Sequence, residues 1–363
     1  MSRLRQLVWL AAIFAACRGA PGAPVFRKTQ LDGAFRSEGV ALADVNRDGL
    51  MDVMAGDIWY AAPNWIPHQI KPPATYSDPP NQYSDAFIVF AADVNGDGWV
   101  DEIVFGFPGQ GAFWRENPRG APGDWVEHPL APTATSESPA LAPWGLVFGT
   151  GPSRISWFEP GNFAEHLIDD LHPVPAHGLG IGDLDGDGRL DVVTHTGYWS
   201  APTDPRSSPW PFTSLDLGPD CAQMYVLDVN GDGLPDVVAS SAHQLGLWWY
   251  EQMPGRVFVQ HQIDATFSQS HSLQLADLNG DGLPDLVTGK RVWAHGLTGD
   301  VDPGGTPFLA WYENRGRGDW AKHVIDSSSG VGTQFAVGTL RAGGKPAIVV
   351  SNKNGVYLFQ QDP

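Results

Sequence analysis

Five segments of the chain place oxygen-bearing side chains at one fixed spacing. Each has Asp at positions one, five and nine, Asp or Asn at position three and Gly at position six, and the segments start at Asp44, Asp93, Asp183, Asp228 and Asp277. Alternating oxygen donors around a tight turn, without Cys or His, favour Ca²⁺ over transition metals. The position-twelve Glu of an EF-hand is absent and the flanks are strand-like, which predicts strand–loop–strand calcium sites.

The five loops together predict about five structural Ca²⁺ ions. Sixteen of the 41 Asp and Glu residues lie in these loops, and so many neighbouring carboxylates would repel one another without a cation. The predicted ligands are the side chains at positions one, three, five and nine: Asp44, Asn46, Asp48, Asp52, Asp93, Asn95, Asp97, Asp101, Asp183, Asp185, Asp187, Asp191, Asp228, Asn230, Asp232, Asp236, Asp277, Asn279, Asp281 and Asp285.

The eleven histidines fall into two groups. Five recur in the pattern aromatic-x-x-His-x-Ile/Leu, which predicts structural strand residues: His68, His128, His166, His261 and His323. The other six lie outside it: His172, His177, His195, His243, His271 and His295. Two of these, His177 and His271, stand six residues before an acidic loop. The second group is a candidate for chemistry or, alternatively, a set of polar residues that solvate a rim.

The spacing of the acidic loops shows that the chain is a repeat. The loop starts are 49, 90, 45 and 49 residues apart, so one repeat is hidden in the long interval, at Trp144–Gly149. A further degenerate copy spans Thr339–Val350. Seven units of about 48 residues, each with four short strands, are typical of β-propeller blades. The two degenerate units lack the acids and are expected to be free of metal.

The two ends of the chain fit the same architecture. The last unit ends after its third strand, Val356–Phe359, and the segment Phe26–Leu31 is an isolated strand at the other end. Pairing the two would close the ring and remove free sheet edges. The sequence therefore predicts an all-β fold over residues 25–363, a seven-bladed β-propeller whose N-terminal strand closes the last blade.

The loops and their phase resemble the FG-GAP/VCBS repeat family, the propellers also seen in integrin α-subunit heads, over roughly residues 25–360. The resemblance implies structural calcium loops between the first two strands of a blade. The segments His271-Ser-Leu, Gly289–His295 and Asp302–Gly305 are similar to the propeller domain of aldos-2-ulose dehydratase, which implies activity on keto-sugars. That enzyme's additional domains, including cupins, have no counterpart in these residues.

Charge and the first residues bear on partners and location. The net charge of −19 and the pI near 4.7 make nucleic acid a poor partner, because phosphate affinity needs a basic face.

Residues 1–17 resemble a signal peptide. Phe14-Ala15-Ala16-Cys17 is similar to a lipobox with a lipidated Cys17, the alternative being ordinary secretory cleavage. Residues 18–24 read as a tether. An exported protein is expected: an outer-membrane lipoprotein, periplasmic or extracellular, touching membrane only through Cys17.

Topology predicts one functional face, opposite the acidic loops, where strand-one entries and strand two–three turns meet. We expect a carbohydrate or protein ligand there; the alternative is a sugar-active lyase or dehydratase, in which a His abstracts a proton next to a carbonyl and Lys290 or Arg291 stabilises the enolate. Neutral imidazoles could also hold an additional divalent metal.

The candidate catalytic residues are His177, His195, His271, Lys290, Arg291 and His295. The candidate ligand contacts are Asp57, Trp59 and Tyr198. The chain has no serine-hydrolase elbow, phosphate loop or zincin motif.

Overall fold

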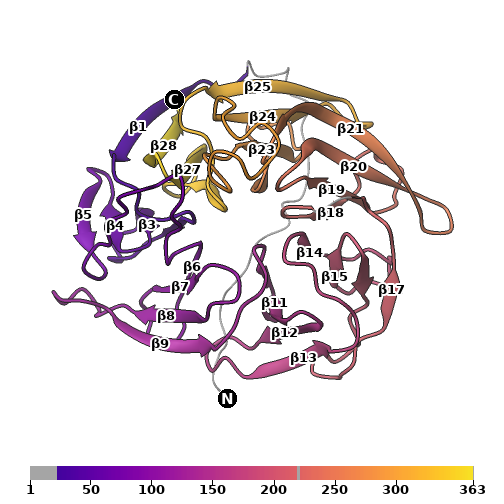
Figure 1. The fold of residues 1–363 in the computed structure, drawn as a ribbon, viewed down its shortest axis with the longest axis horizontal. Coiled ribbons are helices and arrows are strands. Elements are labelled where there is room, and N and C mark those ends of the chain that lie inside the picture. Colours follow the sequence, from indigo (N-terminus) through magenta and orange to yellow (C-terminus); the bar gives the residue numbers. More distant parts are fainter. Residues whose placement is uncertain (1–22, 219–220, 363) are drawn as a thin grey trace.

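All regular structure in the described residues is β. The computed structural model describes residues 23–218 and 221–362, and these form seven four-stranded antiparallel sheets and no helix. Within this part of the chain, no helix could span a membrane. The sheets are arranged as blades around a central axis (Figure 1), so the predicted seven-bladed β-propeller is confirmed. The predicted signal peptide, with Cys17, lies outside the described residues.

Blades 1 to 6 each run from an inner to an outer strand in sequence order. Blades 1 to 3 consist of β2 (Ala41–Ala43), β3 (Asp52–Ala55), β4 (Ile58–Ala61) and β5 (Ile66–Gln69); β6 (Ile88–Ala92), β7 (Asp101–Phe105), β8 (Ala112–Glu116) and β9 (Val126–Ala131); and β10 (Ala140–Ala142), β11 (Gly145–Gly151), β12 (Arg154–Phe158) and β13 (Glu165–Asp169).

Blades 4 to 6 repeat this order, and blade 7 takes its outer strand, β1, from the other end of the chain. They consist of β14 (Leu179–Gly182), β15 (Asp191–Thr194), β16 (Gly197–Trp199) and β17 (Phe212–Ser214); β18 (Tyr225–Leu227), β19 (Asp236–Ser240), β20 (Leu245–Met253) and β21 (Val257–Ser268); β22 (Leu273–Ala276), β23 (Asp285–Lys290), β24 (Phe308–Asn314) and β25 (Trp320–Asp326); and β26 (Phe335–Thr339), β27 (Pro346–Asn352), β28 (Gly355–Gln361) and β1 (Phe26–Asp32).

The seventh blade joins the two ends of the chain, as predicted. The indigo β1 lies beside the yellow β28 (Figure 1), paired antiparallel with Thr29 opposite Leu358. Lys28 Nζ also forms an ion pair with Asp326 Oδ2 of blade 6 at 3.0 Å. The strand thus closes the sheet and ties it to the preceding blade.

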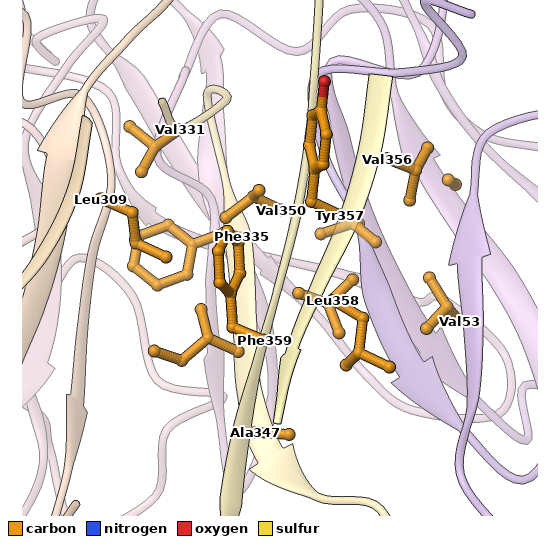
Figure 2. Packing of buried hydrophobic residues seen from close by; sticks show 14 of the residues in the cluster. Val53, Leu309, Val331, Phe335, Ala347, Val350, Val356, Tyr357, Leu358 and Phe359 are labelled. Atoms are coloured by element: carbon orange, nitrogen blue, oxygen red, sulfur yellow. The ribbon is translucent and has the colours of Figure 1, made fainter. Parts of the chain in front are cut away.

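Apolar side chains between neighbouring blades form the core. In the cluster around blade 7, Leu309 of blade 6, Phe335 and Phe359 of blade 7 and Val53 of blade 1 are buried (Figure 2). Because every blade packs on two neighbours in this way, the apolar surface of one blade is covered only when the ring is complete.

Side-chain hydrogen bonds also join neighbouring blades. An aromatic donor of one blade binds an Asp of the fourth strand of the blade before it. Tyr312 Oη donates to Asp264 Oδ2 at 2.7 Å, and Trp199 Nε1 donates to Asp169 Oδ2 at 2.9 Å. Tyr60 donates to Asp32 in the same way, at 2.8 Å.

Candidate functional site

The five acidic loops lie between the first and second strands of blades 1, 2, 4, 5 and 6, as predicted. In the first loop, Asp44 accepts hydrogen bonds from the backbone N–H groups of Asp48 and Gly49, each at 3.0 Å. Gly49 has φ of 86°, a left-handed conformation that suits glycine. The ninth-position Asp52 is buried and accepts from the N–H groups of Val45 and Ala62.

The same bonds recur in the other loops, so their side-chain oxygens are already directed inward. In the loop of blade 4, Asp183, Asp185 and Asp191 each offer an oxygen within 4.8 Å of the others. Burial raises the pKa of each ninth-position Asp to about 6. This all-oxygen donor set fits Ca²⁺. The loops of blades 3 and 7 have no such donors.

The opposite side of the ring is built from the strand-one entries and the strand two–three turns. We call it the entry face. The entries contribute Glu137 and His177 of blades 3 and 4, and His271 of blade 6. The turns contribute His243 of blade 5 and the long 291–307 segment of blade 6. Residues far apart in the sequence therefore meet around the axis.

Glu137, His177 and His271 form a first cluster, which we call triad A. Glu137 Oε2 lies 2.9 Å from His271 Nε2 and 3.2 Å from His177 Nε2. His271 is fully buried, and its Nδ1 lies 3.3 Å from the carbonyl oxygen of Thr333. Burial alone would raise the pKa of Glu137, but the bonds from both imidazoles hold it well below its ordinary value. Burial lowers the pKa of His271 to about 4.

His243, His295 and Asp300 form a second cluster, triad B, directly beside the first. His243 Nε2 lies 3.0 Å from His177 Nε2 of triad A, and its Nδ1 lies 3.2 Å from Asp300 Oδ1. His295 Nδ1 is 3.0 Å from the same oxygen. Each triad presents three ligand atoms within 4.8 Å of one another. Two His and one carboxylate form a common donor set for a transition metal.

A buried ion pair lies next to the triads. Arg291 Nη2 donates to Glu38 Oε1 at 2.8 Å, and both side chains are almost fully buried. Arg291 also stacks on Phe87. Lys353 lies 3.9 Å from the same Glu38 oxygen and above the ring of Tyr83, and it donates to the carbonyl oxygen of Trp293. Burial lowers the pKa of Lys353 to about 8.

Lys290, a predicted catalytic residue, is used to hold a segment in place. Its Nζ donates to Ser268 Oγ at 2.8 Å, Gln269 Oε1 at 3.1 Å and the carbonyl oxygen of Asp302 at 2.7 Å, and the side chain is buried. Lys290 therefore anchors the 291–307 segment, which carries His295 and Asp300 to the entry face.

A pocket of about 510 Å³ adjoins the ion pair. Tyr83 and Ser84 line it together with Tyr76, Asp85 and Phe107. Ser84 Oγ lies 3.3 Å from Glu38 Oε2, which links the pocket to the Arg291–Glu38 pair. The pocket has aromatic faces and hydroxyl groups, as sites for polyhydroxylated ligands have.

The other predicted residues are distributed over the molecule. His195 lies in the β15–β16 turn at the entry face but belongs to neither triad. Asp57 is buried near Lys71 and Arg115 and accepts from the N–H of Ala74.

Trp59 and Tyr198 lie on the acidic-loop side, away from the triads. Trp59 lines a separate pocket of about 520 Å³ with Val45 and Asn46 of the first acidic loop. Tyr198 is buried and accepts a hydrogen bond from Arg256, which also donates to the carbonyl oxygen of Asp185. The expected grouping of these two aromatic residues with the histidines is therefore not found.

The five recurring histidines are structural. Each stacks on the Trp of the adjacent third strand, with ring centroids 4.1 to 4.5 Å apart. In four blades the imidazole also binds the Glu that follows this Trp, as His261 Nε2 does with Glu251 at 2.7 Å. The stack packs the side chains of the third and fourth strands of the blade against each other.

Sequence reasoning missed Glu137, Asp300 and Lys353 and left His243 without a role. A signal was present for two of them. Glu137 precedes β10 as His271 precedes β22, and Lys353 follows β27 where Lys290 ends β23. Aligning the strand-one entries of all seven blades, degenerate ones included, would have found Glu137.

Comparisons with known proteins agree with the fold. Residues 228–288 match the FG-GAP-like repeat family. No curated protein matches the chain significantly. The structure is similar to BBS1N solved in complex with ARL6DN and soaked with mercury, at 13% identity, covering 94% of this chain and 98% of that one, with a TM-score of 0.55. The lead-soaked complex matches at 12% identity with the same coverage and TM-score.

A lectin of Agrocybe aegerita, whose structure concerns recognition of non-reducing terminal N-acetylglucosamine, matches at 17% identity, covering 85% of this chain and 81% of that one, with a TM-score of 0.44. At these identities the similarities concern the fold alone. The chain is thus a seven-bladed β-propeller that carries an FG-GAP-like repeat from the acidic loop of blade 5 to the second strand of blade 6.

Proposed function

We propose that this propeller binds a carbohydrate at its entry face, beside a divalent transition-metal ion held by triad A. The observation that carries the proposal is the convergence of Glu137 Oε2 and the Nε2 atoms of His177 and His271 within hydrogen-bonding distance, at a buried position. His243 Nε2, 3.0 Å from His177 Nε2, completes the set. Nitrogen and carboxylate donors together suit Zn²⁺ or a similar ion.

The two contacts of His177 Nε2 support a cation there. His177 Nε2 faces both Glu137 Oε2 and His243 Nε2. A single proton on His177 Nε2 can serve only one of these contacts. A metal ion bound by all of these atoms removes the conflict, and it compensates a carboxylate that has no Lys or Arg ion pair among the described residues.

The surroundings favour a sugar as the ligand. The pocket beside the Arg291–Glu38 pair is lined by Ser84, Asp85 and Gln110, which can form hydrogen bonds, and by the aromatic rings of Tyr83 and Phe107. A pocket of about 510 Å³ suits a small polyhydroxylated molecule. The resemblance of residues 1–17 to a signal peptide supports a role outside the cytoplasm.

A carbon–oxygen lyase is the second candidate, and Lys353 is the observation that favours it. A buried lysine whose pKa is lowered to about 8 can remove a proton next to a carbonyl, and a bound divalent ion would stabilise the enolate. In this candidate Lys353 takes the part of the base, which the sequence analysis gave to a His, and the bound ion takes the part that it gave to Lys290 or Arg291. Sugar binding that persists in Lys353→Met while turnover is lost would favour the lyase.

We also propose that the five acidic loops bind Ca²⁺ in a structural role. Their support is the inward-facing oxygen set and the repetition of one hydrogen-bond pattern in five blades.

The test compares wild type with Glu137→Gln and, as a control, His261→Ala. Transition metals are removed while calcium is kept in excess, zinc chloride is added, and thermal stability and glycan-array binding are measured. Zinc should raise the melting temperature of wild type and of His261→Ala but not of Glu137→Gln, and glycan binding should follow the same order. Equal zinc stabilisation and glycan binding in Glu137→Gln would refute the proposal.

A further inference from the structure

His243 faces two different groups with its two ring nitrogens. Nε2 lies 3.0 Å from His177 Nε2 of triad A, and Nδ1 lies 3.2 Å from Asp300 Oδ1 of triad B. Among the described residues, the buried Nδ1 makes no well-directed hydrogen bond despite this short separation. Two donor atoms at this spacing, without a hydrogen bond between them, are arranged as the ligands of one metal ion are.

Asp300 is a buried carboxylate without a cationic partner of its own. Its side chain is 3% exposed, and its contacts are His243, His295 and the amide of Gln269, which donates to Oδ2 at 2.9 Å. Within residues 23–218 and 221–362, no Lys or Arg forms an ion pair with it. By contrast, the nearby Glu38 is compensated by Arg291. A buried carboxylate that has only imidazole and amide groups beside it is a favourable place for a bound cation.

We propose that triad B binds a second divalent transition-metal ion and that the imidazole of His243 bridges it to the ion at triad A. The inference rests on the proposed function, because the bridge needs the first ion. A neutral imidazole carries one ring proton. When both nitrogens bind metal, that proton leaves to solvent and His243 becomes an imidazolate, so binding of the second ion releases one proton.

The two triads differ in solvent exposure, and the two proposed ions would therefore have different roles. In triad A, Glu137, His177 and His271 are 0 to 11% exposed, whereas the His295 side chain is 36% exposed. An ion with three protein ligands and a solvent-facing side keeps positions open for an exogenous oxygen. The second ion would therefore be the one that contacts a sugar hydroxyl, with the first as its buried support.

The competing explanation assigns Asp300 to the outer shell of one ion. A carboxylate that accepts a hydrogen bond from a metal-bound imidazole orients that ligand, and Asp300 could serve His243 in this way. The two explanations differ in stoichiometry and in the need for His295.

The experiment counts transition-metal ions per folded chain. Full-length protein freed of transition metals is dialysed against zinc in excess calcium, and zinc is measured in wild type, His295→Ala, Asp300→Asn, Glu137→Gln and the control His261→Ala, with circular dichroism to confirm folding. Two zinc ions are expected in wild type and His261→Ala, and one in His295→Ala and Asp300→Asn.

One zinc in wild type that is kept in His295→Ala but lost in Glu137→Gln would overturn the second ion and leave the proposed function standing. No zinc in wild type would overturn both. The bridge has its own readout, because two Cu²⁺ ions joined by an imidazolate couple antiferromagnetically. Copper-loaded wild type should show fewer paramagnetic spins than copper ions, and a full spin count would overturn the bridge.

Discussion

Buried carboxylates at the entry face are compensated in two ways. Glu38 forms an ion pair with Arg291 at 2.8 Å. Among the described residues, the Glu137 carboxylate pairs with His177 and His271 alone, so its charge depends on these imidazoles and on the proposed ion. Similar residues at one face thus differ in their surroundings, and in the proposed function Glu38 is structural whereas Glu137 binds metal.

This difference predicts that replacing each Glu by Gln, which removes its charge, affects stability to different extents. Glu38→Gln leaves Arg291 buried without a counter-charge and should lower the free energy of unfolding by about 3 kcal/mol, with or without zinc. Glu137→Gln keeps the shape, and in the absence of zinc it should change stability by less than about 1 kcal/mol. Chemical denaturation checks both. A strongly destabilised, metal-free Glu137→Gln would show that Glu137 is a structural residue.

Lys353 predicts a pH effect. Its pKa is lowered to about 8 in the folded protein, against about 10.4 in an unfolded chain. Between these values the unfolded chain binds more protons, so the contribution of Lys353 to stability rises with pH.

From pH 8 to pH 10, wild type should gain about 2 kcal/mol relative to Lys353→Met, while Lys345→Met, at an exposed position, should follow wild type. Urea unfolding at several pH values measures the difference. A constant difference between wild type and Lys353→Met would contradict the lowered pKa.

Among the strands, β1 is the one on which closure of the ring of blades depends. It pairs along its length with β28 and ties to blade 6 through Lys28 and to blade 1 through Asp32. Without it, β28 becomes a free edge and Tyr60 loses its acceptor.

A protein beginning at Gly33 should therefore unfold at a much lower temperature than wild type, by at least 10 °C, or aggregate. A protein beginning at Ala23 keeps β1 and is the matched control. Calorimetry compares them. Equal melting temperatures would mean that the ring does not need the N-terminal strand.

The strands and loops could be predicted from the sequence, whereas most of the candidate site could not. The acidic loops and the Trp–His stacks repeat in most blades, so each copy confirmed the others and even the degenerate blades could be placed. The triads occur once. Glu137 lies in a blade that has lost its acidic loop, and Asp300 lies in a segment without a repeat partner, so no periodic signal marked them. Trp59 and Tyr198 were misplaced because the direction of a side chain within a blade depends on strand pairing.

At the scale of the whole molecule, charge and metal are linked. The chain has a net charge of −19, and the five loops concentrate much of it on one side of the ring. Five Ca²⁺ would bring the formal charge to about −9, which would relieve repulsion among neighbouring blades.

Calcium chelation is thus expected to lower the melting temperature by several degrees through mass action. Replacing Asp183 and Asp185 together by Asn should abolish the contribution of the blade 4 loop. Scanning calorimetry with EGTA and with added calcium measures both, and an unchanged transition would contradict a structural role for calcium.

The central claim is that a transition-metal ion is bound by residues of blades 3, 4 and 6 at the entry face. Anomalous diffraction from crystals of zinc-loaded protein, recorded on both sides of the zinc absorption edge, tests it most directly. The account predicts an anomalous peak bounded by Glu137, His177 and His271, and none in the five acidic loops. Zinc found only on the exposed outer histidines, with water between the residues of triad A, would contradict it.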